Sequence, residues 1–217
     1  MFWNYFEKEA APHLGLREVS FRKVFQYLDS FDSREPILIV ETGCIRTAGN
    51  WIGDGQSTLM FDRYLQDRTG GGRCFAIDID PEATTECRAM VSEATTLFTG
   101  DSVSVLRDLS SSLSLSSPPI ALLYLDSFDL DWENPTPSAV HHLKELVSIY
   151  QWLTPTTLVV VDDSPTIVVG ATSMTGDFQP VRKARVGGKG QYVAEYASQV
   201  GAQLLFSHYQ AGWFGFR

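Results

Sequence analysis

Six short apolar runs along the chain are typical of β-strands. Most are continuous rather than alternating, which is the pattern of strands that helices cover on both faces. In chain order they are ILIV (37–40), CFAI (74–77), TLF (96–98), IALLYL (120–125), TLVVV (157–161) and QLLFSHY (203–209). The last run leads through residues 210–212 into one more strand, which predicts a tight C-terminal hairpin.

Segments with helical periodicity separate these runs. A helical region precedes the first strand, and Pro81 stands where a first helical turn tolerates proline. The predicted helices cover about residues 2–30, then 57–66, 81–93, 137–153 and 191–201. This alternation predicts a parallel α/β sheet in a single domain over 1–217, with an N-terminal helical extension (1–35) and a core (36–217).

Composition narrows the possible partners. The 217 residues are 44% hydrophobic and 20% charged, with a formal net charge of −9. Binding to nucleic acid starts from a basic face, so this balance argues against it. No run approaches the roughly 20 apolar residues of a membrane span, and the first residues lack a signal-peptide pattern. Three cysteines without a CxxC pair favour a reduced protein, so we expect a cytoplasmic location without a membrane partner.

Acidic residues follow five of the predicted strands. Ligands of open α/β sheets lie outside the carboxyl ends of the strands, so these acids would line one negative crevice. They are Glu41, Asp78 with Asp80, Asp101, Asp126, and Asp162 with Asp163. Such a crevice suits a ligand with cationic groups, hydroxyls or a metal ion. Helix capping is an equally good account of Asp80 and Asp101, because aspartate is a favoured N-cap residue and they stand directly ahead of Pro81 and Ser102.

The loop after the first strand, ETGCIRTAGNWIGDGQST (41–58), is rich in glycine. Glycines there let backbone amides approach a ligand, and Ser57 is placed to cap the next helix and to bind an anion at its positive end. The spacing differs from the GxGxxG of dinucleotide enzymes. The glycine pattern alone therefore identifies no ligand.

Several of these motifs, from residue 37 to the C-terminus, resemble those of class I S-adenosylmethionine-dependent methyltransferases, and among them the small metal-dependent O-methyltransferases of the catechol and macrolide-sugar types. The motifs are ETG with GDGQST, AIDIDP (76–81), TGDS (99–102), YLDSFD (124–129) and VVDDSP (160–165). The resemblance implies a Rossmann-like methyltransferase fold, with a mostly parallel seven-stranded sheet, helices on both faces and an antiparallel C-terminal hairpin. It also implies methyl transfer from S-adenosylmethionine to a hydroxyl of a small molecule, a sugar or a phenolic natural product.

The same likeness implies a role for individual residues. Asp78 would accept both ribose hydroxyls, and Asp101 with Ser102 would lie beside the adenine. The expected cofactor-binding residues are Glu41, Gly43, Gly55, Ser57, Asp78, Gly100, Asp101, Ser102 and Asp126. The expected metal ligands are Asp126, Asp162 and Asp163.

The adjacent pair Asp162 and Asp163 supports a metal on physical grounds. Neighbouring carboxylates repel, and holding both ionised in a partly buried place requires a positive partner. Mg²⁺ accepts such an oxygen-rich site, as do Ca²⁺ and Mn²⁺, whereas no Cys/His cluster has zinc spacing. The alternative is that one aspartate faces solvent and the other caps a turn.

The expected catalytic residues are Asp126, which positions the acceptor, and Asp129, a candidate base. Catechol-type relatives have a lysine at the position of Asp129, so the sugar-modifying relatives fit better. Three alternatives stay open. They are a nicotinamide oxidoreductase, disfavoured by the glycine spacing, a metal-dependent hydroxylation or hydrolysis on the same fold, and a non-catalytic adaptor.

Four further segments carry expectations. One or both of His141 and His142 are expected at the solvated surface rather than in a catalytic role, and the serine-rich stretch 110–119 is expected to be a surface loop. The segment 167–190 is long for a connection and typical of a lid. The N-terminal aromatic residues are expected to pack on the core of the domain, with a roof over the substrate or a homodimer contact as open alternatives. They are Phe2, Trp3, Tyr5 and Phe6.

Overall fold

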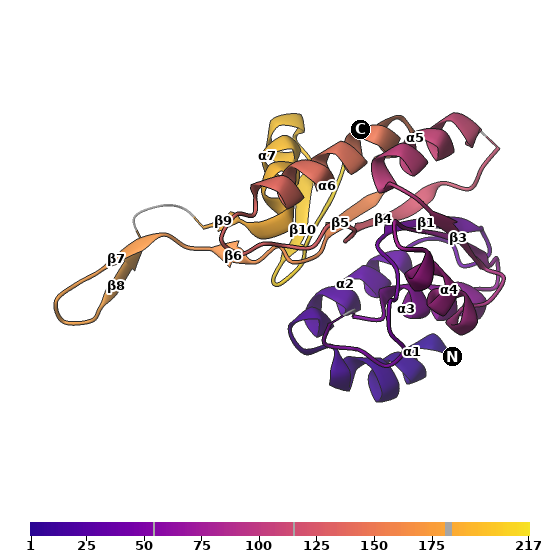
Figure 1. The fold of residues 1–217 in the computed structure, drawn as a ribbon, viewed down its shortest axis with the longest axis horizontal. Helices are drawn as coiled ribbons and strands as arrows, with labels where there is room; N and C mark the ends of the chain where they lie inside the picture. The colour runs from indigo at the N-terminus through magenta and orange to yellow at the C-terminus, as the bar shows by residue number, and fades with distance from the viewer. Residues whose placement is uncertain (54, 115, 181–183) are drawn as a thin grey trace.

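The computed structural model describes residues 1–53, 55–114, 116–180 and 184–217 (Figure 1). Within these ranges a seven-stranded sheet has the order β10-β11-β5-β4-β1-β2-β3. Its strands are β1 (Ile37–Thr42), β2 (Gly72–Asp78), β3 (Thr95–Thr99), β4 (Ile120–Leu125), β5 (Leu158–Val161), β10 (Gln203–Ser207) and β11 (Ala211–Phe214). β11 is antiparallel to β10 and β5, and the other pairings are parallel. The predicted sheet and its C-terminal hairpin are confirmed.

Helices cover both faces of this sheet. Figure 1 shows α1 to α4 on one side and α5 to α7 on the other. The helices are α1 (Phe2–Tyr5), α2 (Glu18–Leu28), α3 (Ser57–Asp67), α4 (Pro81–Met90), α5 (Ser102–Ser112), α6 (Thr136–Ile149) and α7 (Gln191–Val200). Short helical turns are η1 (Phe6–Ala10), η2 (Ala11–His13), η3 (Gly15–Arg17), η4 (Tyr150–Trp152) and η5 (Gly188–Gly190).

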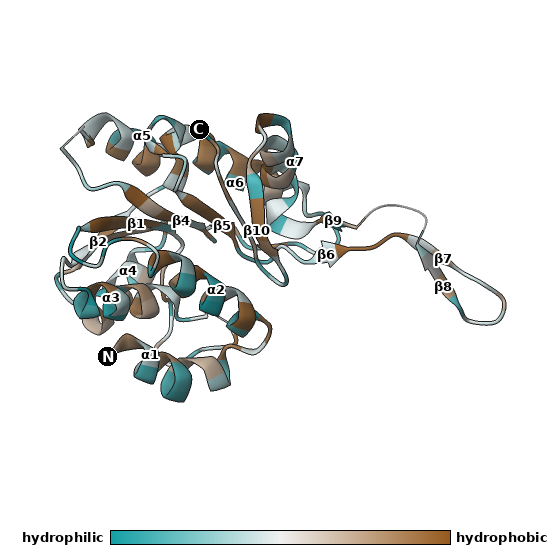
Figure 2. Ribbon diagram, turned by 180° about the vertical axis from the view of Figure 1, so that it is seen from behind, coloured by the Kyte–Doolittle hydropathy of each residue, from teal (hydrophilic) through white to brown (hydrophobic). Residues whose placement is uncertain are grey.

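Two apolar clusters hold these layers together. Successive side chains of a strand point to opposite faces, so a continuous apolar run supplies both. Ile39 lies in one cluster with Phe61 of α3, and its neighbour Val40 lies in the other with Leu146 of α6. All four are essentially buried, and burial of each side chain contributes about 1.5–3 kcal/mol. The central strands accordingly appear hydrophobic in Figure 2.

Two of the strand-end acids cap the helices that follow them. The Asp80 carboxylate accepts a hydrogen bond from the backbone N–H of Glu82 (2.8 Å), at the start of α4. Asp101 accepts one from the N–H of Ser104 (2.9 Å), at the start of α5. Each bond satisfies a helix N–H that has no partner within the helix.

The strand order reverses between β1 and β4. The chain passes from β1 to β2 and β3 on one side, while β4 and β5 lie on the other. In open α/β sheets the carboxyl ends of the strands at such a point form the ligand crevice. The sheet therefore places the ends of β1 and β4, with Glu41 and Asp126, at its most favourable binding position.

Some sequence-based boundaries are wrong, and two of them involve contacts between distant segments or a turn. The predicted strand 203–209 ends at Ser207, because the turn that joins it to β11 already begins at His208, whose N–H donates to Gln210 (2.9 Å). The start of the predicted loop 110–119 belongs to α5, and Ser110 is buried. Its carbonyl oxygen accepts a hydrogen bond from the Trp152 indole (2.6 Å), which fixes the helix end against η4.

The segment 167–190 contains regular structure. β6 (Thr166–Ile167) pairs with β9 (Arg185–Val186), and β7 (Gly170–Thr172) pairs with β8 (Phe178–Pro180). Figures 1 and 2 show the β7–β8 hairpin projecting away from the sheet. The lid interpretation stays a prediction, and the end of this segment returns to the body at η5.

The N-terminal aromatic residues pack on the core of their own chain. Phe2 and Phe6 are buried, and the ring of Phe2 lies 4.4 Å from that of Phe25 between centroids. This confirms the preferred packing, and the homodimer stays a prediction. Across the described ranges, no helix has the length and apolar character that crossing a membrane requires.

Candidate functional site

A cavity of about 230 Å³ opens at the carboxyl ends of β1, β2, β4 and β5. Two cationic side chains, Arg17 and Lys189, reach it from outside the sheet. Its lining includes seven residues that the sequence singled out: Gly43, Ser57, Asp78, Asp80, Asp126, Asp129 and Asp163. The predicted convergence of strand-end acids at one edge of the sheet is thus present in the structure.

Gly43 makes the close approach of β1 and β4 possible. Its φ is +80°, and a Cβ there would lie 2.7 Å from the carbonyl oxygen of Asp126, so a side chain would force the loops apart. The Gly43 N–H donates to the carbonyl oxygen of Ile77 (2.7 Å), which ties the loop to β2 as well. The ends of three strands therefore form one rigid wall of the cavity.

Asp78 presents a fixed carboxylate to the cavity. One oxygen accepts the N–H of Cys44 (3.0 Å) and the other accepts the N–H of Asp80 (2.9 Å). Each carboxylate oxygen retains capacity for a second donor. The group is thus oriented in advance and can accept a pair of hydroxyls.

Glu41 lies below the cavity and is fully buried. One of its oxygens accepts a hydrogen bond from the Ser57 hydroxyl (2.5 Å), and among the described residues the other has no hydrogen-bond partner. Burial raises the pKa of Glu41 well above its usual value. Ser57 does not cap α3 as predicted, because it is the first helical residue and its hydroxyl is committed to Glu41, while Gln56 occupies the N-cap position.

A smaller cavity of about 70 Å³ adjoins the first and shares Asp78 with it. Its wall includes Asp101, Ser102, Phe128 and His141. The hydrogen bonds from Ser104 that make Asp101 a helix cap also lower the pKa of its carboxyl group. Asp101 can therefore cap α5 and at the same time form part of the wall of this cavity.

Two of the expected cofactor-binding glycines lie away from these walls. Neither Gly55 nor Gly100 is among the described residues that line the two cavities. Gly55 instead lies against the side chain of Arg17, 3.4 Å from where a Cβ would stand. Its contribution to the site is indirect, through the position of that arginine.

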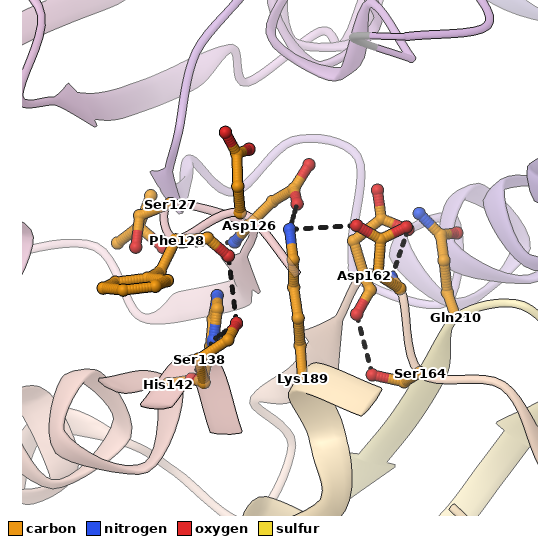
Figure 3. Close-up of polar contacts among 12 residues, drawn as sticks. Asp126, Ser127, Phe128, Ser138, His142, Asp162, Ser164, Lys189 and Gln210 are labelled. Carbon is orange, nitrogen blue, oxygen red and sulfur yellow. Dashed lines mark hydrogen bonds and ion pairs between the residues drawn. The ribbon is translucent and has the colours of Figure 1, made fainter. Parts of the chain in front are cut away.

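The three carboxylates predicted to hold a metal come together around two cationic side chains. Arg17 donates to Asp162 (2.8 Å) and to Asp163 (3.3 Å). The Lys189 ammonium lies 2.5 Å from Asp126 and 3.1 Å from Asp163 (Figure 3). The positive partners that the adjacent aspartates require are thus supplied by the chain itself.

The charges in this cluster shift each other's pKa values. Burial opposes ionisation of the Asp163 carboxyl group, but Lys189 and Arg17 outweigh it and lower the pKa. Burial likewise opposes the Lys189 ammonium, and Asp126 with Asp163 outweighs it, so that pKa is raised. Lys189 is therefore a permanent cation in this site. Asp126 differs, because burial together with Asp162 and Asp163 raises its pKa despite Lys189.

The arrangement does not fit the predicted metal site. Among the residues that the structure describes, no group of three or more acid, histidine or cysteine side chains is placed to hold a metal ion. Both oxygens of Asp163 are engaged by Arg17 and Lys189. Asp162 is engaged too, since it accepts from Arg17, from the Tyr124 hydroxyl (3.2 Å) and from a backbone N–H. The ligand set was implied by the resemblance and supported by the adjacent acids, and neither takes account of Arg17 and Lys189, which fold against these acids.

The candidate base Asp129 lies at the mouth of the cavity. Its side chain is 83% exposed and pairs with Arg46 at 3.6 Å. Asp126 keeps only 22% of its side chain exposed. Of the two predicted catalytic residues, Asp126 is the one in a sheltered position.

Of the two histidines, one or both of which were expected at the solvated surface, His142 is not solvated. It is fully buried, and its Nδ1 lies 2.7 Å from the carbonyl oxygen of Ser138. His141 is half-buried beside the smaller cavity, with Nε2 2.9 Å from the Ser102 hydroxyl. Glu145 completes the group and accepts a hydrogen bond from Ser127 (2.5 Å).

The two site residues that were not predicted differ in how far the local sequence marks them. Lys189 stands in VGGKG, where the surrounding glycines mark an unusual backbone. Arg17 stands in an ordinary helical region with no local signal, and only the packing of the N-terminal segment brings it to the site.

No protein-family model matches the chain, and no curated protein does. Among solved structures, the fold is similar to that of the MycE methyltransferase from the mycinamycin biosynthetic pathway, in complex with Mg and SAH. The TM-score is 0.54 at 10% identity, covering 94% of this chain and 54% of that one. It is also similar to LepI in complex with SAM (TM-score 0.51, 14% identity, 89% and 46% covered). A third similar structure is described as a pericyclic reaction enzyme. Its TM-score is 0.51 at 14% identity, covering 89% of this chain and 47% of that one.

The chain spans about half the length of these three proteins. At such identities the likeness shows the fold alone. Together with the strand order, it shows that the chain has the Rossmann-like methyltransferase fold expected from its motifs.

Proposed function

We propose that this chain transfers a methyl group from S-adenosylmethionine to a hydroxyl of a small molecule, such as a sugar or a phenolic natural product. The observation that carries the proposal is the convergence of Gly43, Asp78 and Asp126 on one cavity where the strand order reverses. Two solved structures of this fold are described as complexes with SAH or SAM. The likeness of the motifs supports the same cofactor here.

The two adjoining cavities suit the parts of this cofactor. The Asp78 carboxylate, held by two backbone amides, would accept the ribose hydroxyls. The smaller cavity, with Ser102, Phe128 and His141, would take the adenine. The sulfonium would then lie toward Asp126, where three carboxylates face two cationic groups and the excess of negative charge favours a cation.

The chemistry follows from this placement. The acceptor oxygen would attack the methyl carbon, and the carbon–sulfur bond would break with its electron pair remaining on sulfur. The hydroxyl proton would pass to Asp126, whose raised pKa makes it a better proton acceptor than an ordinary aspartate. Holding both reactants in line supplies much of the rate enhancement. No step passes through a metal ion, because the arrangement of the three acids does not fit one.

Calorimetric titration with S-adenosylhomocysteine tests the proposal. We expect saturable binding to the full chain, and a loss of about 10- to 100-fold in affinity in Asp78→Ala, because two hydrogen bonds to a charged group disappear. Asp108→Ala removes the same charge from an exposed position of α5 and serves as the control.

Two results would contradict the proposal. Binding of NAD without binding of S-adenosylhomocysteine would favour the nicotinamide oxidoreductase. Cofactor binding without the gain of a methyl group, measured by mass spectrometry over sugars and phenols, would favour a non-methylating reaction. One structure of this fold is described as a pericyclic reaction enzyme, so that outcome has a structural parallel.

A further inference from the structure

Lys189 is a buried cation at the centre of the acidic cluster. Its side chain is 2% exposed and points between Asp126 and Asp162 (Figure 3). Burying an unpaired ammonium costs several kcal/mol, so a lysine occupies such a place only with close partners. The two carboxylates at 2.5 and 3.1 Å are those partners.

The backbone around Lys189 is built for this approach. Gly188 has φ +56°, and a Cβ there would lie 2.0 Å from the carbonyl oxygen of Asp163. A Cβ on Gly190 would lie 2.5 Å from the Ser164 hydroxyl. The Lys189 N–H donates to the same Asp163 carbonyl (3.1 Å). Glycines on both sides thus let η5 dock on the Asp162–Asp163 turn, with the lysine directed inward.

We propose that the Lys189 ammonium takes the place of a divalent cation in this acidic cluster, so that the site works without a bound metal. Asp126, Asp162 and Asp163 are oxygen ligands of the kind that Mg²⁺ accepts. Arg17 and Lys189 already offset two of their three charges. A metal ion would have to displace the lysine and leave its ammonium without partners.

This inference deepens the proposed function and rests on it for its chemical consequence. An ammonium has three N–H donors. Two are directed to Asp126 and Asp163, and the third would bond the acceptor oxygen and orient it. Lys189 would thereby stabilise the developing negative charge on that oxygen while Asp126 takes the proton.

Binding of Mg²⁺ alone tests the inference without cofactor or acceptor. We expect calorimetry to detect no saturable binding of MgCl₂ to the full chain at millimolar concentrations. In Lys189→Ala we expect binding to appear with at least tenfold higher affinity, and Asp163→Asn added to that variant should abolish it. Lys144→Ala, which removes a charge from the exposed face of α6, should behave like the unmodified chain.

Thermal unfolding gives a second readout. MgCl₂ should raise the midpoint of Lys189→Ala, and NaCl at equal ionic strength should not. If Lys189→Ala does not fold, Lys189→Met keeps the packing of the stem and replaces it in both measurements. Binding of Mg²⁺ to the unmodified chain that Asp163→Asn abolishes would overturn the inference. Absence of Mg²⁺ binding in the folded lysine variants would overturn it equally, because the acids would then form no cation site. Neither result bears on cofactor binding, which is measured separately.

Discussion

Among single residues, His142 has a pKa shift that predicts how the stability of the protein depends on pH. It is fully buried, and its Nε2 has no hydrogen-bond partner within the described part of the chain. Burial lowers the pKa of His142 to about 4, and the attraction of Glu145, 3.9 Å away, is too weak to restore it; Lys189 and His141 lower it further. The imidazole is therefore neutral in the folded protein at physiological pH.

This gives a pH dependence of stability with a definite sign. Between pH 6.5 and about 4 the unfolded chain binds a proton at His142 that the folded chain does not, so the free energy of unfolding falls as the pH is lowered. The contribution amounts to about 3 kcal/mol across this window. His142→Asn should flatten the dependence, measured by urea denaturation at a series of pH values. The control is His208→Asn, which changes an exposed histidine. If the free energy of unfolding depended on pH equally in the unmodified chain and in both variants, His142 would titrate in the folded protein as it does in an unfolded chain.

The sequence predicted some site residues and not others for a physical reason. Asp78 and Asp126 follow buried strands directly, so their positions are fixed by the sheet, which the apolar runs predict well. Arg17 and Lys189 enter the site from distant segments, and no local pattern gives their final position. The expected metal rested on the resemblance of two motifs and on the number of acids, and the charge balance depends on Arg17 and Lys189, which only the folded chain brings to those acids.

Among the elements, η5 is the one on which the placement of Lys189 depends. Gly188→Ala would combine a strained φ of +56° with a contact of 2.0 Å to the Asp163 backbone. We expect a loss of about 2–4 kcal/mol in the free energy of unfolding. Gly201→Ala, at φ +80° with no atom within 4 Å, isolates the cost of the backbone angle and should lose only about 1 kcal/mol. Urea denaturation measures both, and equal losses would mean that η5 does not dock tightly.

Boundaries of elements were predicted less well than their existence. The parallel strands form continuous apolar runs because both faces are covered, and their short length indicates strands rather than buried helices. The turn between β10 and β11 lies earlier than predicted, since backbone pairing rather than residue type decides where it closes. α5 extends into the serine-rich stretch because Ser110 is packed against Trp152, a contact between distant segments.

At the scale of the whole molecule, the N-terminal extension is part of the site. Aromatic packing of Phe2 and Phe6 against α2 and α3 fixes the segment on one face of the sheet. The same segment delivers Arg17 to Asp162, where it is held further by the ring of Tyr209 at 4.9 Å. The core (36–217) and the N-terminal extension are therefore coupled through a buried ion pair as well as through apolar contact.

The β7–β8 hairpin is the part of the molecule least tied to this core. Its two strands pair with each other, it projects from the body in Figures 1 and 2, and it exposes Met174 and Phe178. An isolated two-stranded hairpin is marginally stable in water, so it adds little to the stability of the rest. Replacing residues 171–179 by a short glycine–serine linker should change the free energy of unfolding by less than about 0.5 kcal/mol. Affinity for S-adenosylhomocysteine should stay unchanged, because η5 and the strand ends supply the cavity walls. A larger loss of stability that grows with protein concentration would contradict this, and would show that the hairpin binds a second copy of the chain.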